Sequence, residues 1–215
     1  MAVETHCPLC DGEQLAAYSR DRYREYLQCG DCELVFVPAE SRLSLSAERA
    51  VYDLHNNRVD DPGYRGFLSR LSTPLMARLP PPARGLDFGC GPGPALAHML
   101  EEAGYSVAVY DPYYAPGEHV LARSYDFVTA TEVVEHLHRP GWELERLWSL
   151  LEPGGWLGVM TKRVLNRAAF DRWHYRNDPT HVCFFSIATW QWWAARHDIE
   201  PEFPAADVVL LQRQH

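Results

Sequence analysis

The feature that most constrains the fold is the alternation of apolar, strand-like runs with amphipathic, helix-like runs from residue 84 onward. Strand-like runs cover 85–89, 106–110, 126–134, 156–162 and 207–214, and helix-like runs cover 95–104, 142–151 and 187–197. This alternation favours a mainly parallel sheet with helices on both faces. Ligands of such sheets bind at the carboxyl ends of the strands, near the point where the strand order reverses.

A glycine-rich loop, LDFGCGPG, follows the first of these strands and opens the first helix. Glycines allow the backbone to turn sharply and to approach a ligand closely. Dinucleotide-binding proteins use a related loop, so the glycines alone are weak evidence. Asp87 precedes the first glycine, where a carboxylate suits an ammonium group better than a pyrophosphate. Asp111 ends the next strand, where it can accept hydrogen bonds from a ribose diol.

Residues 84–212 resemble the class I S-adenosylmethionine (SAM)-dependent methyltransferases. The resemblance rests on LDFGCGPG, the acid Asp111, the strand YDFVTATEVVEHL and the turn EPGGWL, which occur in the family's order. It implies an α/β fold with a Rossmann-like, mainly parallel seven-stranded sheet and helices on both faces. It also implies a SAM site formed by Asp87, Gly89, Cys90, Gly91, Gly93, Asp111, Thr131 and Glu132.

One departure from this pattern concerns the segment between the second strand and the next obvious one. Only fourteen residues, 112–125, lie there, whereas the family usually fits a helix and a strand. We expect the short run HVLA, residues 119–122, to form a vestigial strand. The adenine pocket is therefore less well defined by the sequence than the rest of the cofactor site.

Four cysteines predict a zinc-binding unit at the N-terminus. They form two C-x-x-C pairs separated by eighteen residues: Cys7, Cys10, Cys29 and Cys32. Two such pairs can complete a tetrahedron around Zn²⁺, and this spacing is typical of zinc sites. His6 borders the first pair and is expected to be a neighbour. A closed four-cysteine site is structural, because about forty residues cannot build a sufficient core.

These features divide the chain into three predicted parts. Residues 1–40 form a zinc ribbon, a small β unit in which YLQC and ELVFVP are short strands. Residues 41–82 form a helical connector that covers the cofactor site and ends at a run of three prolines. Residues 83–215 form the SAM-binding methyltransferase domain.

The stretch TEVVEHLHRP places Glu132, Glu135 and His136 in an E-x-x-E-H pattern. If a helix begins at residue 132, the three side chains share one face. They could form a polar rim that faces the substrate, or His136 or Glu135 could accept a proton from it. They could also bind Mg²⁺ or Mn²⁺. His181, in the later loop NDPTH, is the candidate fourth ligand and a further candidate catalytic residue.

E-x-x-E-H followed by such a histidine is similar to the small-RNA 3′-terminal 2′-O-methyltransferases, and E-x-x-E-H alone also occurs among quinone-biosynthesis O-methyltransferases. Both similarities imply a second metal that binds vicinal oxygens of the acceptor. Its ligands would be Glu132, Glu135, His136 and His181. The surrounding sequence is unlike either family, so the three interpretations stay open.

The charge and the hydropathy of the chain limit the kinds of partner that it can have. The net charge of −9 argues against a general nucleic-acid binder. A local basic segment is either a solvated face or a phosphate-binding surface: Lys162, Arg163, Arg167, Arg172 and Arg176. No apolar run approaches the ~18 residues of a membrane span, and no signal peptide is visible, so we expect a cytoplasmic protein without membrane partners.

The combination of a zinc ribbon with a methyltransferase domain resembles two groups of enzymes, the deoxysugar C-methyltransferases and a set of ribosomal-RNA guanine methyltransferases. We expect a SAM-dependent enzyme that acts on a small polar acceptor such as a sugar, either free, phosphorylated or nucleotide-linked. One alternative is an RNA methyltransferase, acting by metal-assisted 2′-O or base methylation. Another is a zinc-ribbon binding module with an inactive methyltransferase domain.

Overall fold

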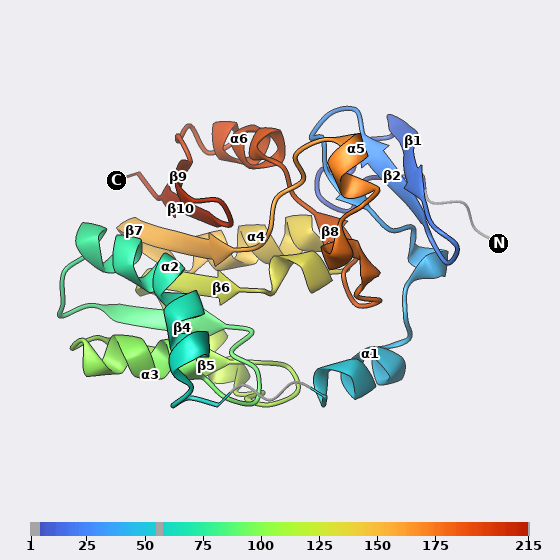
Figure 1. The fold of residues 1–215 in the computed structure, drawn as a ribbon. Helices are drawn as coiled ribbons and strands as arrows, with labels where there is room; N and C mark the ends of the chain where they lie inside the picture. The colour runs from blue at the N-terminus through green and yellow to red at the C-terminus, as the bar shows by residue number, and fades with distance from the viewer. Residues whose placement is uncertain (1–4, 55–57, 215) are drawn as a thin grey trace.

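The computed structural model describes residues 5–54 and 58–214. Residues 1–4 of the predicted ribbon, 55–57 of the predicted connector and the last residue lie outside the described residues. A large sheet with helices on both faces forms most of the molecule, and a small sheet lies beside it (Figure 1).

The large sheet has six strands in the order β5-β4-β6-β7-β10-β9. β5, β4, β6 and β7 are parallel, whereas β10 is antiparallel to both of its neighbours. The strand order reverses beside β4, as expected for a ligand-binding edge. The bounds are β4 Arg84–Phe88, β5 Ser106–Tyr110, β6 Tyr125–Thr131, β7 Leu151–Met160, β9 Glu202–Ala205 and β10 Val208–Gln212.

Two hydrophobic clusters cover the two faces of this sheet. On β10, Val208 and Leu210 belong to one cluster while Val209 and Leu211 belong to the other, because successive strand side chains point to opposite faces. The first cluster includes residues of α2 Pro62–Arg78 and α3 Ala95–Glu102, and the second includes residues of α4 Pro140–Ser149 and α6 Ile187–Ala195. The α/β fold class is therefore confirmed.

The expected seven strands are corrected to six in the described chain. The segment after β5 turns back at once, with a bridge between Asp111 and Ala115, and then forms the short 3₁₀ helix η2 Glu118–Ala122. HVLA is thus helical and not a strand. The reason is length, since the few residues left after this turn cannot cross the sheet and add a strand at its edge.

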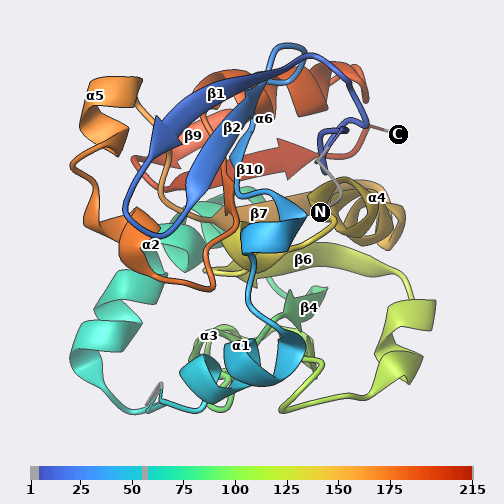
Figure 2. The same ribbon diagram turned by 90° about the vertical axis from the view of Figure 1, so that its right-hand side faces the viewer.

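The small sheet belongs to the N-terminal unit, but its last strand comes from the other end of the chain. Its order is β1-β2-β3-β8, with β1 Leu15–Arg20, β2 Glu25–Cys29, β3 Val35–Phe36 and β8 Cys183–Phe184. β8 pairs antiparallel with β3. Both views show α5 Arg167–Phe170 beside the β1–β2 hairpin (Figures 1 and 2). The N-terminal unit is therefore joined to the larger part by shared backbone hydrogen bonds.

The helix α1 Leu45–Tyr52 lies apart from the layers of the large sheet, beyond the carboxyl ends of its parallel strands (Figure 1). The side chain of Ser44 caps its first turn. Three short 3₁₀ helices complete the described elements: η1 Ala39–Ser41, η3 Val134–His136 and η4 His174–Asn177. Among the described residues, no helix combines the length and the apolar character that crossing a membrane requires.

Candidate active site

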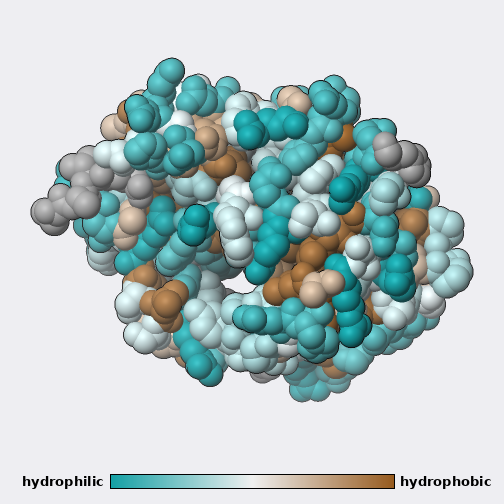
Figure 3. Space-filling view, turned by 180° about the vertical axis from the view of Figure 1, so that it is seen from behind, coloured by the Kyte–Doolittle hydropathy of each residue, from teal (hydrophilic) through white to brown (hydrophobic). Residues whose placement is uncertain are grey.

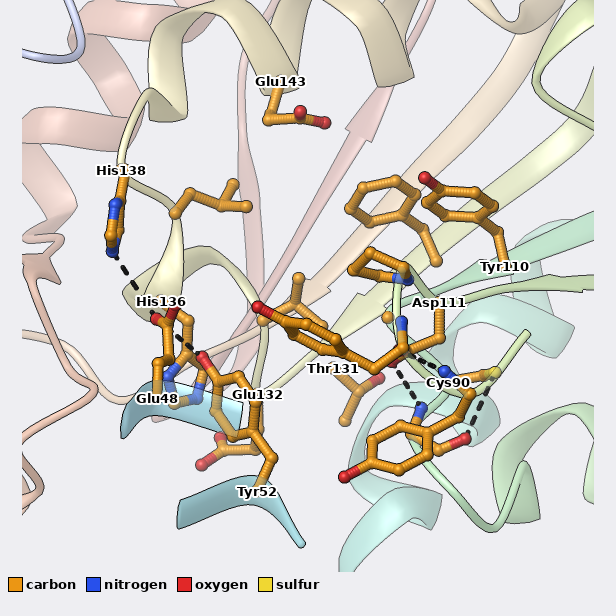
Figure 4. A pocket seen from close by; sticks show the side chains of 18 of the residues that line it. Glu48, Tyr52, Cys90, Tyr110, Asp111, Thr131, Glu132, His136, His138 and Glu143 are labelled. Atoms are coloured by element: carbon orange, nitrogen blue, oxygen red, sulfur yellow. Dashed lines mark hydrogen bonds and ion pairs between the residues drawn. The ribbon is translucent and has the colours of Figure 1, made fainter. Parts of the chain in front are cut away.

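A cavity of about 890 Å³ opens at the carboxyl ends of β4, β5 and β6. Figure 3 shows the surface hollowed on the side opposite to that of Figure 1, and Figure 4 shows many of the side chains that line the cavity. The glycine-rich loop forms one wall and α1 forms another. The size falls in the upper part of the range of about 300–1,000 Å³ for small-molecule sites.

The glycine-rich loop is held in a conformation that requires glycine. Gly89 has a φ of +73° and Gly91 a φ of +65°, both in the left-handed region. A Cβ on Gly89 would lie 2.4 Å from Cγ2 of Val133. The N–H of Gly89 donates to the carbonyl of Tyr110 at 2.7 Å, which ties the loop to the end of β5.

Asp111 organises the cavity wall next to this loop. Its Oδ2 accepts the N–H of Gly91 at 3.0 Å, and its Oδ1 accepts the N–H groups of Tyr113 and Tyr114 at 2.8 and 3.1 Å. The carboxylate lines the cavity, and of its about four lone-pair sites one, on Oδ2, is left for a hydroxyl donor. One hydroxyl of a vicinal diol fits this arrangement.

Asp87 lies behind the loop. It is only 4% exposed, and its Oδ1 accepts a hydrogen bond from the hydroxyl of Thr129 at 2.9 Å. Burial raises the pKa of Asp87 to about 7. Neither Asp87 nor Gly93 lines the cavity directly, whereas Cys90 does, and burial raises the pKa of its thiol to about 12.

An aromatic group at one end of the cavity was not foreseen from the sequence. The rings of Phe88 and Tyr110 stack with centroids 5.3 Å apart. The Arg146 guanidinium lies over Phe88 and over Trp142, and it pairs with Glu143 at 2.7 Å. The only sequence signal was aromatic residues at strand ends and an amphipathic helix at 142–151.

Glu132 stands at the start of the E-x-x-E-H segment in a strained backbone conformation, with a φ of +54°. The helix from residue 132 that would align the three side chains does not form, and the segment has the single 3₁₀ turn η3 from Val134. The carboxyl of Glu132 lines the cavity, and its Oε1 has no hydrogen-bond partner among the described residues. Burial, followed by the nearby Glu135, raises the pKa of Glu132 to about 8.

Glu135, His136 and His181 converge although no helix aligns them. One ligand atom from each lies within 4.8 Å of the others. Nδ1 of His136 donates to the carbonyl of Thr180 at 3.2 Å, and Nδ1 of His181 donates to that of Tyr175 at 2.7 Å. In the neutral rings these bonds leave the lone pair on Nε2. Both imidazoles line the cavity.

Glu135 is fully buried behind the two histidines. It accepts a short hydrogen bond from the hydroxyl of Tyr175, and its Oε2 has no partner among the described residues. Burial raises the pKa of this carboxyl. Glu132 falls outside the convergent group, although the Tyr175 hydroxyl also reaches its Oε2 at 3.4 Å.

α1 contributes two further residues that the sequence did not reveal. Glu48 and Tyr52 are four residues apart on one face of α1, and the Tyr52 hydroxyl donates to Oε1 of Glu48 at 3.0 Å. Nε2 of His138 lies 3.5 Å from Glu48, and the ring of Tyr52 lies 5.3 Å from that of His136 (Figure 4). The helix thus faces the histidines across the cavity.

The four N-terminal cysteines form a second cluster, with their sulfur atoms within 4.8 Å of one another. Sγ of Cys7 lies 3.5 Å from that of Cys32, and Sγ of Cys10 lies 3.4 Å from that of Cys29. The residue after each C-x-x-C pair has a positive φ, Asp11 in one turn and Glu33 in the other.

Backbone N–H groups also point at the sulfurs of this cluster, from Gly12 to Cys10 and from Asp31 to Cys29, both at 3.4 Å. This repeated geometry fits a zinc ribbon. His6 is outside the cluster and pairs with Glu13 at 3.3 Å.

The basic segment does not form a phosphate site at the cavity. Among the described residues, none of its five cations lines the cavity. Arg163 donates to the carbonyls of Ala205 and Val208, and the buried Arg176 donates to the hydroxyl of Ser19 at 2.9 Å. Two of the five are therefore engaged in internal contacts.

The six-stranded topology and the glycine-rich loop at the reversal of strand order define a SAM-dependent methyltransferase. Residues 61–202 match a protein family described as methyltransferase domain, so the chain belongs to that family. No curated protein matches the sequence.

Two solved structures illustrate the likeness in fold. The 1,6-didemethyltoxoflavin-N1-methyltransferase of Burkholderia thailandensis, solved with S-adenosylhomocysteine (SAH), has a TM-score of 0.52 at 18% identity, over 86% of this chain and 98% of that one. The magnesium protoporphyrin IX methyltransferase of Synechocystis, solved with SAM, has a TM-score of 0.53 at 16% identity, over 80% and 92%. At such identities the likeness concerns the fold, and the acceptors named differ.

Proposed function

We propose that this methyltransferase transfers a methyl group from SAM to a small polar acceptor, such as a sugar or a related metabolite. The observation that carries this proposal is that the glycine-rich loop and the polar group of Glu132, His136 and His181 open into one cavity. A cofactor and a small acceptor bound there would lie in the same cavity.

The cofactor half of the cavity is assigned by the donors and acceptors that line it. Oδ2 of Asp111 would accept a hydrogen bond from a ribose hydroxyl, and the stacked Phe88 and Tyr110 offer flat apolar surface for the adenine. The loop at Gly89 and Gly91 would receive the methionine part close to its backbone. Asp87 supports the loop from behind.

The acceptor half is assigned to Glu132, His136 and His181. Bound SAM supplies an electrophilic methyl group, so the protein has to orient the acceptor and remove its proton. Nε2 of His136 or His181 is the candidate base, because Nδ1 of each ring is already hydrogen-bonded to a backbone carbonyl. Glu135 would stabilise the imidazolium that forms.

A small acceptor fits this cavity better than folded RNA. α1 covers the acceptor half, and two cations of the predicted phosphate surface are engaged elsewhere. Each phosphate contact to RNA needs a cation, and the net charge of the chain is −9.

The test combines cofactor binding with an acceptor screen. We expect calorimetry to show saturable binding of SAH, and Asp111→Ala to weaken it by at least about tenfold because the ribose acceptor is lost. Labelled SAM is then supplied with separate panels of sugars, nucleotide sugars, amines and RNA. Methylation of RNA alone would refute the proposal for a small acceptor.

A second candidate function, metal-assisted methyl transfer, is favoured by two observations. Ligand atoms of Glu135, His136 and His181 lie within 4.8 Å of one another, and buried carboxyl oxygens of Glu132 and Glu135 have no partner among the described residues. These nitrogen and oxygen donors suit a divalent ion such as Mn²⁺, with Mg²⁺ less suited because it prefers oxygen ligands. Such an ion would lower the pKa of an acceptor hydroxyl.

Titration of Mn²⁺ into the SAH-saturated protein tests this second candidate. We expect one saturable site that is lost in Glu135→Gln and in His181→Ala. Glu143→Gln, at the opposite end of the cavity, serves as the matched control and should bind normally (Figure 4). Absence of binding to the wild-type protein would leave the acid–base interpretation.

We also propose that the four N-terminal cysteines hold a structural zinc ion. The cluster has cysteine donors only, and three of its four side chains are buried. Zinc stoichiometry measured on the purified protein tests this assignment, and a metal-free folded protein would contradict it.

A further inference from the structure

We propose that the N-terminal ribbon positions the acceptor half of the active site, and that Arg24 is the positioning residue through which it acts. The inference rests on the proposed function insofar as it takes the cavity around His181 to be the acceptor site. It gives the ribbon a role inside this enzyme in place of the recognition of a polymer.

Arg24 extends from the β1–β2 hairpin to a loop more than 150 residues later in the sequence. Its Nη1 donates to the carbonyls of Pro179 and His181 at 3.2 and 3.0 Å. Its Nη2 donates to the carbonyl of Asp178 at 3.0 Å and makes a short hydrogen bond to that of Arg176. A planar guanidinium can serve several carbonyls at once, which a lysine ammonium cannot reproduce.

The ribbon side of this contact is fixed by Asp21. Its Oδ1 accepts the backbone N–H groups of Tyr23 and Arg24 at 2.7 and 2.8 Å, and its Oδ2 accepts the hydroxyl of Tyr26 at 2.7 Å. The Tyr26 hydroxyl also lies 3.3 Å from the carbonyl of Arg176. Because Tyr26 is fully buried, its hydrogen bond to Asp21 fixes the turn from which the Arg24 side chain extends.

The loop that Arg24 holds carries the acceptor-side groups. Asp178 and His181 both line the cavity. The ring of His181 lies 4.1 Å from that of Tyr175 and 4.7 Å from that of His136, measured between centroids. Because Tyr175 also donates to Glu135, a displacement of this loop would move His181 and disturb its contacts with His136 and Glu135.

The same loop continues into backbone pairing with the ribbon. The N–H of Val37 donates to the carbonyl of Val182 at 2.9 Å, and the N–H of Val182 donates to the carbonyl of Glu135 at 2.7 Å. β8 then pairs with β3. Val182 therefore links the ribbon directly to the E-x-x-E-H segment, and Arg24 fixes the residues immediately before it.

The test compares Arg24→Ala with Arg24→Lys and with the control Arg20→Ala. Arg20 is on the same hairpin and is exposed, and its guanidinium pairs with Glu25 on the next strand, at 3.4 Å. Hydrogen–deuterium exchange is followed at residues 176–182. In NMR spectra, the ring Cε1–H resonance of His181, assigned by its absence in His181→Asn, reports whether this ring stays between those of Tyr175 and His136. Zinc content and SAH affinity are measured on each variant.

We expect Arg24→Ala to raise the exchange rate of the His181 and Val182 amides by about ten- to a hundredfold. The His181 resonance should move towards the position of an exposed histidine. Arg24→Lys should lie between this variant and the wild type, and Arg20→Ala should match the wild type. Zinc content and SAH affinity should stay unchanged, because neither site includes Arg24.

Two results would overturn the inference. One is that the amide exchange rates at residues 176–182 and the His181 ring resonance are the same in Arg24→Ala as in Arg20→Ala. The other is exchange that rises throughout the ribbon with loss of zinc, because Arg24 would then support the ribbon and not the loop. Failure of the wild-type protein to bind SAH would instead contradict the proposed function, and the loop measurements would still decide the role of Arg24.

Discussion

The buried carboxyl of Asp87 makes the stability of the cofactor loop depend on pH. Burial raises the pKa of Asp87 from 3.8 to about 7 in the folded protein. In the unfolded chain the group ionises first as the pH rises, so the unfolded state gains stability over the folded one. Stability is therefore lost between about pH 4 and pH 7, and the loss is complete above the folded pKa.

The magnitude follows from the size of this shift. One pKa unit corresponds to about 1.4 kcal/mol, so the raised pKa of Asp87 costs the folded state about 4 kcal/mol at pH 8, where the carboxyl is ionised, and roughly 1–2 kcal/mol at pH 5, where it stays protonated in the folded protein. Asp87→Asn removes this cost and can still accept the Thr129 hydroxyl. Relative to wild type, the free energy of unfolding of the variant should therefore rise by about 2–3 kcal/mol between pH 5 and pH 8.

Calorimetric melting of the SAH-free protein at both pH values measures this difference. For a chain of this size, about 2–3 kcal/mol corresponds to roughly 4–12 °C in Tm. Glu118→Gln, at an exposed carboxylate, is the control and should show no such change. The reasoning would be refuted if the difference in Tm between Asp87→Asn and wild type were the same at both pH values. The carboxyl of Asp87 would then be charged in the folded and in the unfolded state at both.

Three further predictions concern the loop, the cysteine cluster and the buried tyrosine. Gly89→Ala should weaken SAH binding by at least about a hundredfold in calorimetry, because its methyl group overlaps Val133 and its φ is positive, and unchanged affinity would contradict the assignment. Cys10→Ser should lower the zinc content and the Tm together, as metal analysis and melting would show, and a zinc-free variant that melts like wild type would refute a structural role. Tyr175→Phe should lower the free energy of unfolding by about 1–3 kcal/mol in chemical denaturation, since it leaves Glu135 with unpaired oxygens, while SAH affinity stays unchanged.

The sequence was most informative where structure is decided locally. The strands around LDFGCGPG and the helix after it form close to their expected bounds, because the apolar pattern and the glycines act over a few residues. The spacing of the two C-x-x-C pairs also predicted that the four cysteines form one cluster. Each pair folds into its own turn, and the turn at Asp11 repeats at Glu33.

The sequence was misleading where a local pattern had a nonlocal outcome. The E-x-x-E-H spacing suggested a shared helix face, yet Glu132 has a positive φ and η3 is a single turn. Glu135, His136 and His181 converge all the same, because backbone bonds to the loop at 175–182 orient them. β8 has two residues, and a pattern that short cannot predict its pairing with β3.

The two halves of the cavity differ in the same way. Most of the proposed cofactor half is built from residues between β4 and the end of β6, which are close in sequence and carry a recognisable motif, and Trp142 and Arg146 of α4 complete it. The proposed acceptor half joins α1 and the loop at 175–182, to which Arg24 of the N-terminal unit donates hydrogen bonds. Its shape depends on contacts between segments far apart in the chain, so it can change while the cofactor motif stays the same. Proteins of this fold can therefore share the cofactor half and differ in acceptor, which is why the acceptor has to be sought in the contacts around His181 and not in the motif.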